Sequence, residues 1–248
     1  MQASLHSEWR RSGFTLIELM IVIAIIAIVT SIALPKLQHA RTSANEVSAV
    51  ATLRAVLASQ NQVLSSPAID TDGDGVAEFG YFAELAGMVP ARISAGGAPA
   101  PGVPGTDELV PSPLLSTLGG VNASVITRAG YAFQVWLPGP SAGGLVPGIA
   151  EDPTGGKIAP LFPDPDISEI AWCAYAWPLS VRHSGTPAFF VNQEGMLMQT
   201  FNRGAAPYSG IGTGPNFDAA FSQVGDMTSP IALNGVLGAD GNLWVPVQ

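Results

Sequence analysis

The sequence predicts an α+β protein in which one long N-terminal helix packs on a small antiparallel β-sheet. Three observations support this fold class: an apolar run at residues 14–34, helical spacing of apolar residues to about residue 65, and short alternating segments after residue 130. An amphipathic helix needs an apolar cover, and only the second half of the chain can supply one. We therefore divide the chain into a leader at residues 1–13, a transmembrane helix at 14–35, an amphipathic helix at 36–66 and a globular domain at 67–248.

The apolar run from Phe14 to Leu34 is long enough to cross a membrane. As a helix it would extend about 31 Å, which matches the hydrocarbon thickness of a bilayer. A secretory signal has a shorter apolar run, and its cleavage site lies after that run. Here the small residue that would mark cleavage, Gly13, lies before the run. The run therefore predicts a membrane-spanning helix that stays with the mature chain.

Glu18 is the one ionisable residue inside this run. A carboxylate in the hydrocarbon region costs about 2.5 kcal/mol or more unless it finds a partner or reaches the interface. Two interpretations stay open for Glu18. It makes a contact with a positive group, or it lies close enough to the membrane surface to reach water.

This N-terminus resembles that of type IV prepilins and of the related pseudopilins of type II secretion. The matching features are a basic leader ending in Gly13, Phe14 directly after it, Glu18 five positions into the mature chain and Pro35 at the end of the run. The resemblance implies that a membrane aspartyl peptidase cuts after Gly13, that the new amine of Phe14 is methylated, and that the helices pack into a filament core. It also implies a precursor in the bacterial inner membrane, with a cytoplasmic N-terminus and a periplasmic or extracellular C-terminal domain.

The resemblance also suggests assembly roles for Glu18 and Pro35. Cleavage would leave a positive amine on Phe14, which Glu18 of a neighbouring subunit can neutralise, and this contact would set the register of the helices. Pro35 removes the helical hydrogen bond to the carbonyl of Ser31, which predicts a kink or a loosened turn. A plain bend at the membrane boundary is the alternative for Pro35.

Charge argues against a nucleic-acid-binding protein. The chain has a formal net charge of −9. The leader contains Glu8, Arg10 and Arg11, so removing it makes the net charge of the mature chain more negative by one. A nucleic-acid-binding domain would show a basic patch or stripe, and the sequence marks none. We therefore expect no nucleic-acid partner.

Cys173 is the single cysteine, so no intrachain disulfide can form. Many pilins close a C-terminal loop with a disulfide, and this chain departs from them. His183 is the one histidine available to activate Cys173 as a nucleophile, but a buried core cysteine is the preferred interpretation. No phosphate-binding loop, zinc-ligand cluster or catalytic serine motif is found in the sequence, so we expect no enzyme.

Beyond Pro35 the apolar residues recur at helical spacings up to Pro67, where we expect the helix to end. The predicted apolar stripe consists of Leu37, Ala40, Ala44, Val47, Val50, Leu53, Leu57 and Leu64. The predicted polar face consists of Gln38, Arg41, Asn45, Ser48, Thr52, Ser59 and Gln62.

The segment after this helix, DTDGDGVAEFG at residues 70–80, is similar to the first half of a calcium-binding loop. Asp70, Asp72 and Asp74 at alternate positions offer the oxygen ligands that Ca²⁺ prefers. Tyr81 stands where an EF-hand has its glutamate, and Glu78 is the nearby acid that can close a shorter loop. We therefore expect Ca²⁺ to bind Asp70, Asp72, Asp74 and Glu78, with a solvated acidic turn as the alternative.

Strand signals are confined to the second half of the chain. We expect a short helix at residues 81–88 and a long loop rich in proline and glycine at 89–113. Strands are predicted at residues 131–137 and 170–177, a hairpin at 187–191 and 196–201, and a final hairpin around 239–242. Tryptophans at these spacings are more often core residues than ligand-binding residues, so we expect Trp136, Trp172, Trp177 and Trp244 in the core.

The sequence thus predicts a structural subunit of a type IV pilus or pseudopilus. The resemblance implies as partners copies of the same chain and other pilins, the prepilin peptidase, a membrane platform protein and an assembly ATPase. The alternative is an uncleaved, single-span, membrane-anchored binding protein that uses its calcium loop. Major pilins, minor pilins and pseudopilins are not separated by these observations.

Overall fold

The computed structural model describes residues 14–247, and these form two compact units that divide between Arg41 and Thr42. The predicted leader, including Gly13, lies outside the described residues. The long helix α1 (Leu16–Leu64) begins in the first unit and ends in the second. Its observed bounds lie close to the predicted ones, and the predicted α+β fold class is confirmed.

In the first unit the helix assignment is unbroken through Pro35. The hydroxyl of Thr30 donates to the carbonyls of Ile26 (2.8 Å) and Ala27 (3.1 Å), and that of Ser31 donates to Ile28 (2.7 Å). These hydroxyls therefore bond to the turn before the proline and not to the carbonyl that Pro35 leaves without its helical donor. The loosened turn predicted at Pro35 does not interrupt the helix.

The second unit is built on a seven-stranded antiparallel sheet with the order β3-β4-β6-β7-β8-β9, in which β5 pairs with β4. Two short strands, β1 and β2, pair separately, and α2, η1 and α3 are short helices. The bounds are α2 Phe82–Leu85, β1 Ile93–Ser94, β2 Pro99–Ala100, η1 Ser116–Leu118, β3 Ile126–Arg128, β4 Tyr131–Pro138, β5 Gly148–Ala150, α3 Pro165–Ser168, β6 Cys173–Pro178, β7 Ala188–Asn192, β8 Met198–Thr200 and β9 Val245–Pro246.

The strand predictions hold for β4, β7 and β8, with small shifts at their ends. The predicted strand at 170–177 starts three residues later, because Asp164 caps the short helix α3 just before it, with Oδ1 accepting from the backbone N–H of Ile167 (3.1 Å). The final hairpin is a bridge between Leu237 and Leu243, followed by β9. The observed sheet also contains β3, β5 and β9, which we did not predict as strands because they are too short to leave a periodic signal.

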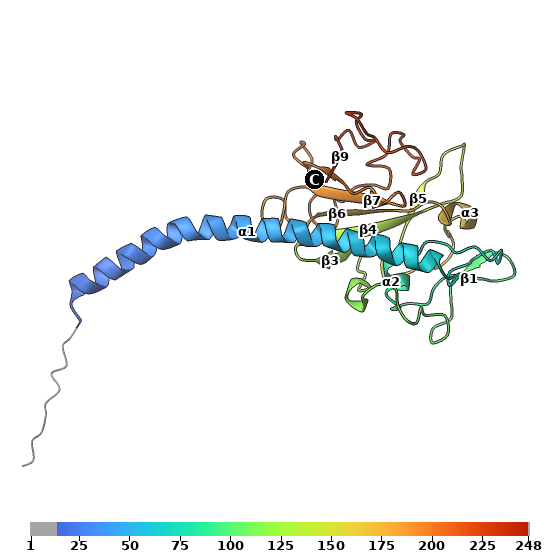
Figure 1. Cartoon of the computed structure of the whole chain (residues 1–248), viewed down its shortest axis with the longest axis horizontal. Coiled ribbons are helices and arrows are strands. Elements are labelled where there is room, and N and C mark those ends of the chain that lie inside the picture. Colours follow the sequence, from blue (N-terminus) through green and yellow to red (C-terminus); the bar gives the residue numbers. More distant parts are fainter. Residues whose placement is uncertain (1–13, 248) are drawn as a thin grey trace, which may run out of the picture. The chain divides into compact units, whose positions relative to one another are not determined.

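The two faces of the sheet have different covers (Figure 1). Alternate residues of β4, such as Phe133 and Val135, share one buried cluster with Leu53 and Val56 of α1. The opposite face packs against the chain's last third, whose members of the second cluster include Phe221 and Trp244. The C-terminal segment, which showed little pattern in the sequence, therefore forms the third layer of this unit.

The buried face of α1 differs from the predicted stripe by about one residue. Thr52 and Ser59, predicted to be polar and outward, are buried, whereas Val47 is 67% exposed and Leu64 is 36% exposed. The hydroxyl of Thr52 donates to the carbonyl of Ser48 (2.8 Å), whereas the hydroxyl of Ser59 is buried without a partner among the described residues. The completely buried tryptophans Trp172, Trp177 and Trp244 confirm the core prediction, and Trp136 is partly buried.

Candidate functional sites

The start of α1 is closed by a reciprocal pair of hydrogen bonds between Thr15 and Glu18. The backbone N–H of Thr15 donates to Oε2 of Glu18 (2.9 Å), and the backbone N–H of Glu18 donates to the hydroxyl of Thr15 (3.2 Å). The hydroxyl of Thr15 also donates to the same Oε2 (2.7 Å). This is a capping box, in which Thr15 is the N-cap and Glu18 the third helical residue. Glu18 therefore has a partner within its own chain, which our sequence argument did not foresee.

The apolar side chains of the first unit are exposed. Phe14 is 78% exposed, Ile21 54% and Ile28 63%, and every described residue up to Arg41 is exposed. The most apolar stretch of α1 is long and apolar enough to cross a membrane, and none of that stretch is buried within the chain. A contiguous apolar surface of this size marks a contact with a membrane or with other proteins.

The acidic loop brings Asp70, Asp72 and Asp74 together, each with a carboxylate oxygen within 4.8 Å of the others. Asp70 also organises the turn, because its Oδ1 accepts from the N–H of Gly73 (2.7 Å) and its Oδ2 accepts from the N–H of Gly75 (3.0 Å). Both glycines have φ near +90°, a conformation that an L side chain rarely adopts. The sequence therefore folds this segment into a tight turn lined with carboxylates.

Two acids from a distant segment join this loop. Asp72, Asp166 and Glu169 form a second group with carboxylate oxygens within 4.8 Å of one another. Burial, followed by the charges of Asp74 and Asp72, raises the pKa of Glu169, whose Oε1 is buried without a hydrogen-bond partner among the described residues. The sequence carries no local signal for these two residues, because they follow the loop by about ninety positions and reach it through α3.

Glu78, the fourth predicted ligand, has different contacts. Its Oε1 accepts from the N–H (2.6 Å) and the hydroxyl (2.5 Å) of Thr71, and its Oε2 forms an ion pair with Nη1 of Arg92 (3.2 Å). Arg92 also pairs with Glu84 through Nε (3.1 Å), and all three charged residues are fully buried. Glu78 thus ties the acidic loop to the core. Breaking a buried pair of this kind is strongly destabilising because it leaves an uncompensated charge.

A further buried carboxylate, Glu151, lies beside this ionic network. Its Oε1 accepts from the N–H groups of Ala83 (2.8 Å) and Gly156 (2.9 Å), and its Oε2 has no partner within residues 14–247. Burial raises the pKa of Glu151 from 4.5 to about 8, although these two hydrogen bonds act in the opposite direction. Glu151 is therefore largely protonated at neutral pH.

The residues considered for covalent chemistry have ordinary surroundings. Cys173 is completely buried, its Sγ lies 3.6 Å from the carbonyl of Phe217, and burial raises the pKa of its thiol well above 9.0. His183 is exposed in a turn, where its Nδ1 lies 3.5 Å from Oγ of Ser180. Cys173 is thus a core residue, as its sequence context suggested.

The raised pKa of Glu151 predicts a specific pH dependence of stability. Between pH about 4.5 and about 8 the folded chain holds a proton that the unfolded chain releases, so the free energy of unfolding falls as pH rises, by at most about 1.4 kcal/mol per pH unit. Glu151→Gln keeps a neutral side chain of the same shape and should flatten this dependence. Melting temperatures of the full chain in detergent, measured from pH 5 to 8.5, provide the test.

The exposed Glu194 supplies the matched control for this prediction, because Glu194→Gln removes a carboxylate that stands in solvent. This variant should keep the pH profile of the unmodified chain. An unchanged profile in Glu151→Gln would mean that Glu151 is already ionised in the folded protein.

Comparison with known proteins locates one family signature in the chain. Residues 10–34 match the model of the prokaryotic N-terminal methylation motif. No curated protein and no solved structure matches the chain. The match covers Phe14, Glu18 and the exposed apolar helix described above. The motif supports a type IV pilin-like or pseudopilin precursor, and the chain is consistent with a type IV pilin-like family.

Proposed function

We propose that the protein is a structural subunit of a type IV pilus or pseudopilus. In this proposal it is made as a single-pass precursor in the bacterial inner membrane, cut after Gly13 by a prepilin peptidase, and polymerised through its N-terminal helix. The observation that carries the proposal is the coincidence of the methylation motif at residues 10–34 with an apolar helix that the chain leaves uncovered.

In this proposal the exposed helix is covered first by lipid and then, in the filament, by the helices of neighbouring subunits. Each large apolar side chain gains about 1.5–3 kcal/mol when it leaves water, so the helix must lie in lipid before assembly. Lipid tails are themselves apolar, so leaving the bilayer for a filament requires close helix packing and polar contacts in addition to burial. The platform protein and the assembly ATPase would supply the work of extraction, and copies of the chain and other pilins would supply the new cover.

Glu18 is the polar contact best placed to select the register. Its hydrogen bonds to Thr15 both end on Oε2, and Oε1 accepts no hydrogen bond from the described residues, so Oε1 is available to a second partner. After cleavage the amine of Phe14 of an adjacent subunit would be positive and would lie in apolar surroundings. In apolar surroundings, leaving one charge of an ion pair without its partner costs much more free energy than removing both charges. Helices in the wrong register would leave Glu18 and this amine unpaired, so they would be unfavourable.

The assembly role of Glu18 is separable from its capping role. A glutamine at the third helical position also completes a capping box, whereas alanine does not. Glu18→Gln and Glu18→Ala should therefore both leave cleavage intact and both reduce filament yield at least about tenfold, because each removes the charge. The measurement is the amount of protein in the sheared filament fraction compared with the processed protein in the membrane.

The pair of variants also shows how this account of Glu18 could fail. Normal filament yield from Glu18→Gln, with loss only in Glu18→Ala, would show that Glu18 serves to cap its own helix. Loss of cleavage in either variant would show that Glu18 is needed for processing, which precedes assembly.

The second candidate is an uncleaved, single-span, membrane-anchored binding protein that uses a calcium loop. The observation that favours a cation is the addition of Asp166 and Glu169 to the loop of Asp70, Asp72 and Asp74. Carboxylates this close repel one another, and Ca²⁺ accepts six to eight oxygen ligands. A calcium site on this loop is compatible with either candidate. What separates the two is whether Gly13 is a cleavage site.

Calcium binding predicts a difference in thermal stability. A calcium concentration one hundred times the dissociation constant stabilises the folded state by about 2.7 kcal/mol, or roughly 5–10 °C for a domain of this size. Asp72→Asn should abolish the difference between melts with calcium and with chelator, because Asp72 is shared by both acidic groups. Glu194→Gln should retain it. If the unmodified chain has the same melting temperature with calcium and with chelator, the loop does not bind calcium and is a solvated acidic turn.

A further inference from the structure

Opposite charges gather at the two ends of the second unit. Helix α3, with Asp166 and Glu169 at or beside it, directly precedes β6, and the turn that carries Arg182 directly follows β6. The acidic loop joins α3 at the first end. At the other end Asn45 of α1 donates to the carbonyl of Ser184 (2.8 Å), so Arg182 lies where α1 enters this unit. A strand of this length keeps the two ends about 20 Å apart.

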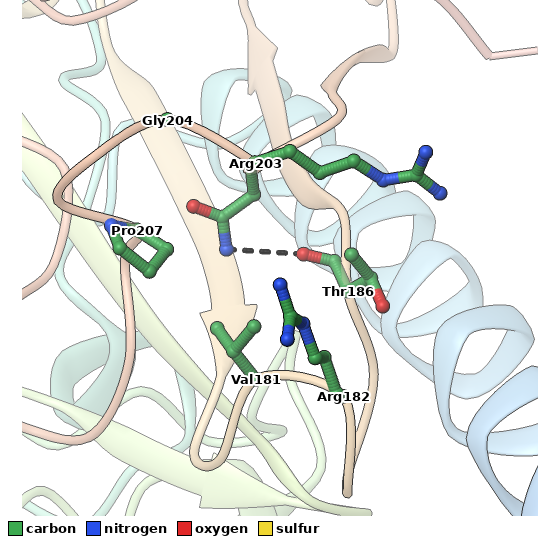
Figure 2. Close-up of a pocket in the computed structure, with 7 residues that line it drawn as sticks. Val181, Arg182, Thr186, Arg203, Gly204 and Pro207 are labelled. Atoms are coloured by element: carbon green, nitrogen blue, oxygen red, sulfur yellow. Dashed lines mark hydrogen bonds between the residues drawn. The ribbon is translucent and has the colours of Figure 1, made fainter.

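The basic end contains a pocket of about 400 Å³ that includes Arg182 and Arg203 in its lining. Figure 2 shows the guanidinium of Arg182 beside Thr186, while the side chain of Arg203 extends from the opposite loop away from Arg182. Both arginines are exposed. The ion pairs of residues 14–247 involve Arg92 and Lys157, so neither pocket arginine has a carboxylate partner within the described chain.

Both arginines are presented by loops that internal hydrogen bonds hold firmly. Arg182 has a φ of 70°, and its N–H donates to the carbonyl of Gly185 (2.7 Å). Asn202, directly before Arg203, has a φ of 51° and donates from Nδ2 to the carbonyls of Thr186 (3.0 Å) and Tyr208 (2.9 Å). Such left-handed conformations are costly for residues with a side chain and are found preferentially at functional sites.

The chemistry of this pocket favours a carboxylate or phosphate ligand. A guanidinium presents a planar fork of donors that matches these groups, and it needs no deprotonation step to remain charged. Glu46 of α1 brings one carboxylate beside this pocket, because its Oε1 accepts from the N–H of Thr186 (3.1 Å), and the two arginines outnumber it. An anionic group from outside the chain would complement this pocket.

We propose that this arginine pocket receives the acidic end of a second copy of the same chain, formed by Asp70, Asp72, Asp74, Asp166 and Glu169. The inference rests on the proposed filament function and names one contact within it. A surface at one end that binds a different surface at the other end is a head-to-tail interface, and repetition of such an interface produces an open helical filament when the rotation does not close. The opposite charges at the ends of this unit meet that requirement.

The charges also suit a reversible contact. Complementary charges steer subunits together and penalise wrong orientations, such as two acidic ends facing each other. A calcium ion on the loop would leave five carboxylates with a net negative charge, so cation binding and arginine binding are compatible. The other occupant with the same chemistry is the phosphate of a lipid headgroup, which the experiment below distinguishes.

Charge reversal with rescue in full-length protein tests the contact. Arg182→Glu combined with Arg203→Glu should reduce filament yield about tenfold, which corresponds to about 1.4 kcal/mol. Asp72→Lys, Asp74→Lys and Asp166→Lys together change the acidic end from five carboxylates to two carboxylates and three lysines, and should cause a similar loss. A chain that carries these three substitutions and the two at the arginines has a negative pocket and a net positive opposite end, so it should recover most of the yield. Thermal melts of each variant in detergent establish that it folds.

Matched controls use exposed charges outside the two surfaces. Arg54→Glu, at an exposed position of α1, and Glu194→Lys make the same changes of charge and should leave the yield close to that of the unmodified chain. Normal yield from the double arginine variant would overturn the inference while the filament function stands. Loss without rescue would also overturn it and would favour a lipid phosphate as the ligand. If the unmodified chain forms no filaments, it is the proposed function that fails.

Discussion

An apolar helix that its own chain leaves uncovered is the constraint on which the rest of this structure depends. The described residues before Thr42 are exposed, whereas one face of α1 between Ala49 and Val63 is buried in the core of the second unit. One helix therefore has two environments. Its second half is satisfied by folding, and its first half can be satisfied only by a membrane or by other molecules. A protein built in this way needs a membrane or another molecule to cover this half of the helix after folding.

The second unit is arranged to hold its half of α1 firmly. The sheet offers α1 one buried face, and the C-terminal segment covers the other with a cluster of aromatic residues, in which Phe190 contacts Phe221 (5.4 Å between ring centroids) and Tyr175 (5.0 Å). At the end of α1, Gln60 exchanges two hydrogen bonds with the backbone of Gly80, of 2.8 and 2.9 Å. These contacts connect the helix to the segment that continues into the Arg92 ionic network. A force applied along α1 would therefore be transmitted through these hydrogen bonds to the rest of the second unit.

Periodicity in the sequence was sufficient to predict the elements that are long or regularly alternating. The predictions of α1, β4 and the β7–β8 hairpin needed only the spacing of apolar residues, because burial on one face imposes that spacing. The buried face of α1 was misplaced because Thr52 and Ser59 look polar in the sequence, although the hydroxyl of Thr52 is satisfied by its own helix.

The candidate sites were predicted only where their residues are neighbours in the chain. Asp70, Asp72 and Asp74 could be grouped from the sequence, but Asp166 and Glu169 reach them only through the fold. Arg182 and Arg203 likewise share a pocket because two separate turns are brought together after β6 and β8. Glu78, which we predicted as a fourth ligand, also forms an ion pair with Arg92, a contact that cannot be recognised from the sequence alone. Tertiary contacts between distant segments leave no local pattern, and they account for these differences.

The central claim is that this chain is processed at Gly13 and then assembled through the helix that follows. The most direct test is the intact mass and N-terminal sequence of the protein recovered from its own membrane or cell surface. The account predicts a chain that begins at Phe14 and carries a methyl group on its amine. A chain that keeps residues 1–13 in cells with an active prepilin peptidase would contradict the account and would favour the membrane-anchored binding protein.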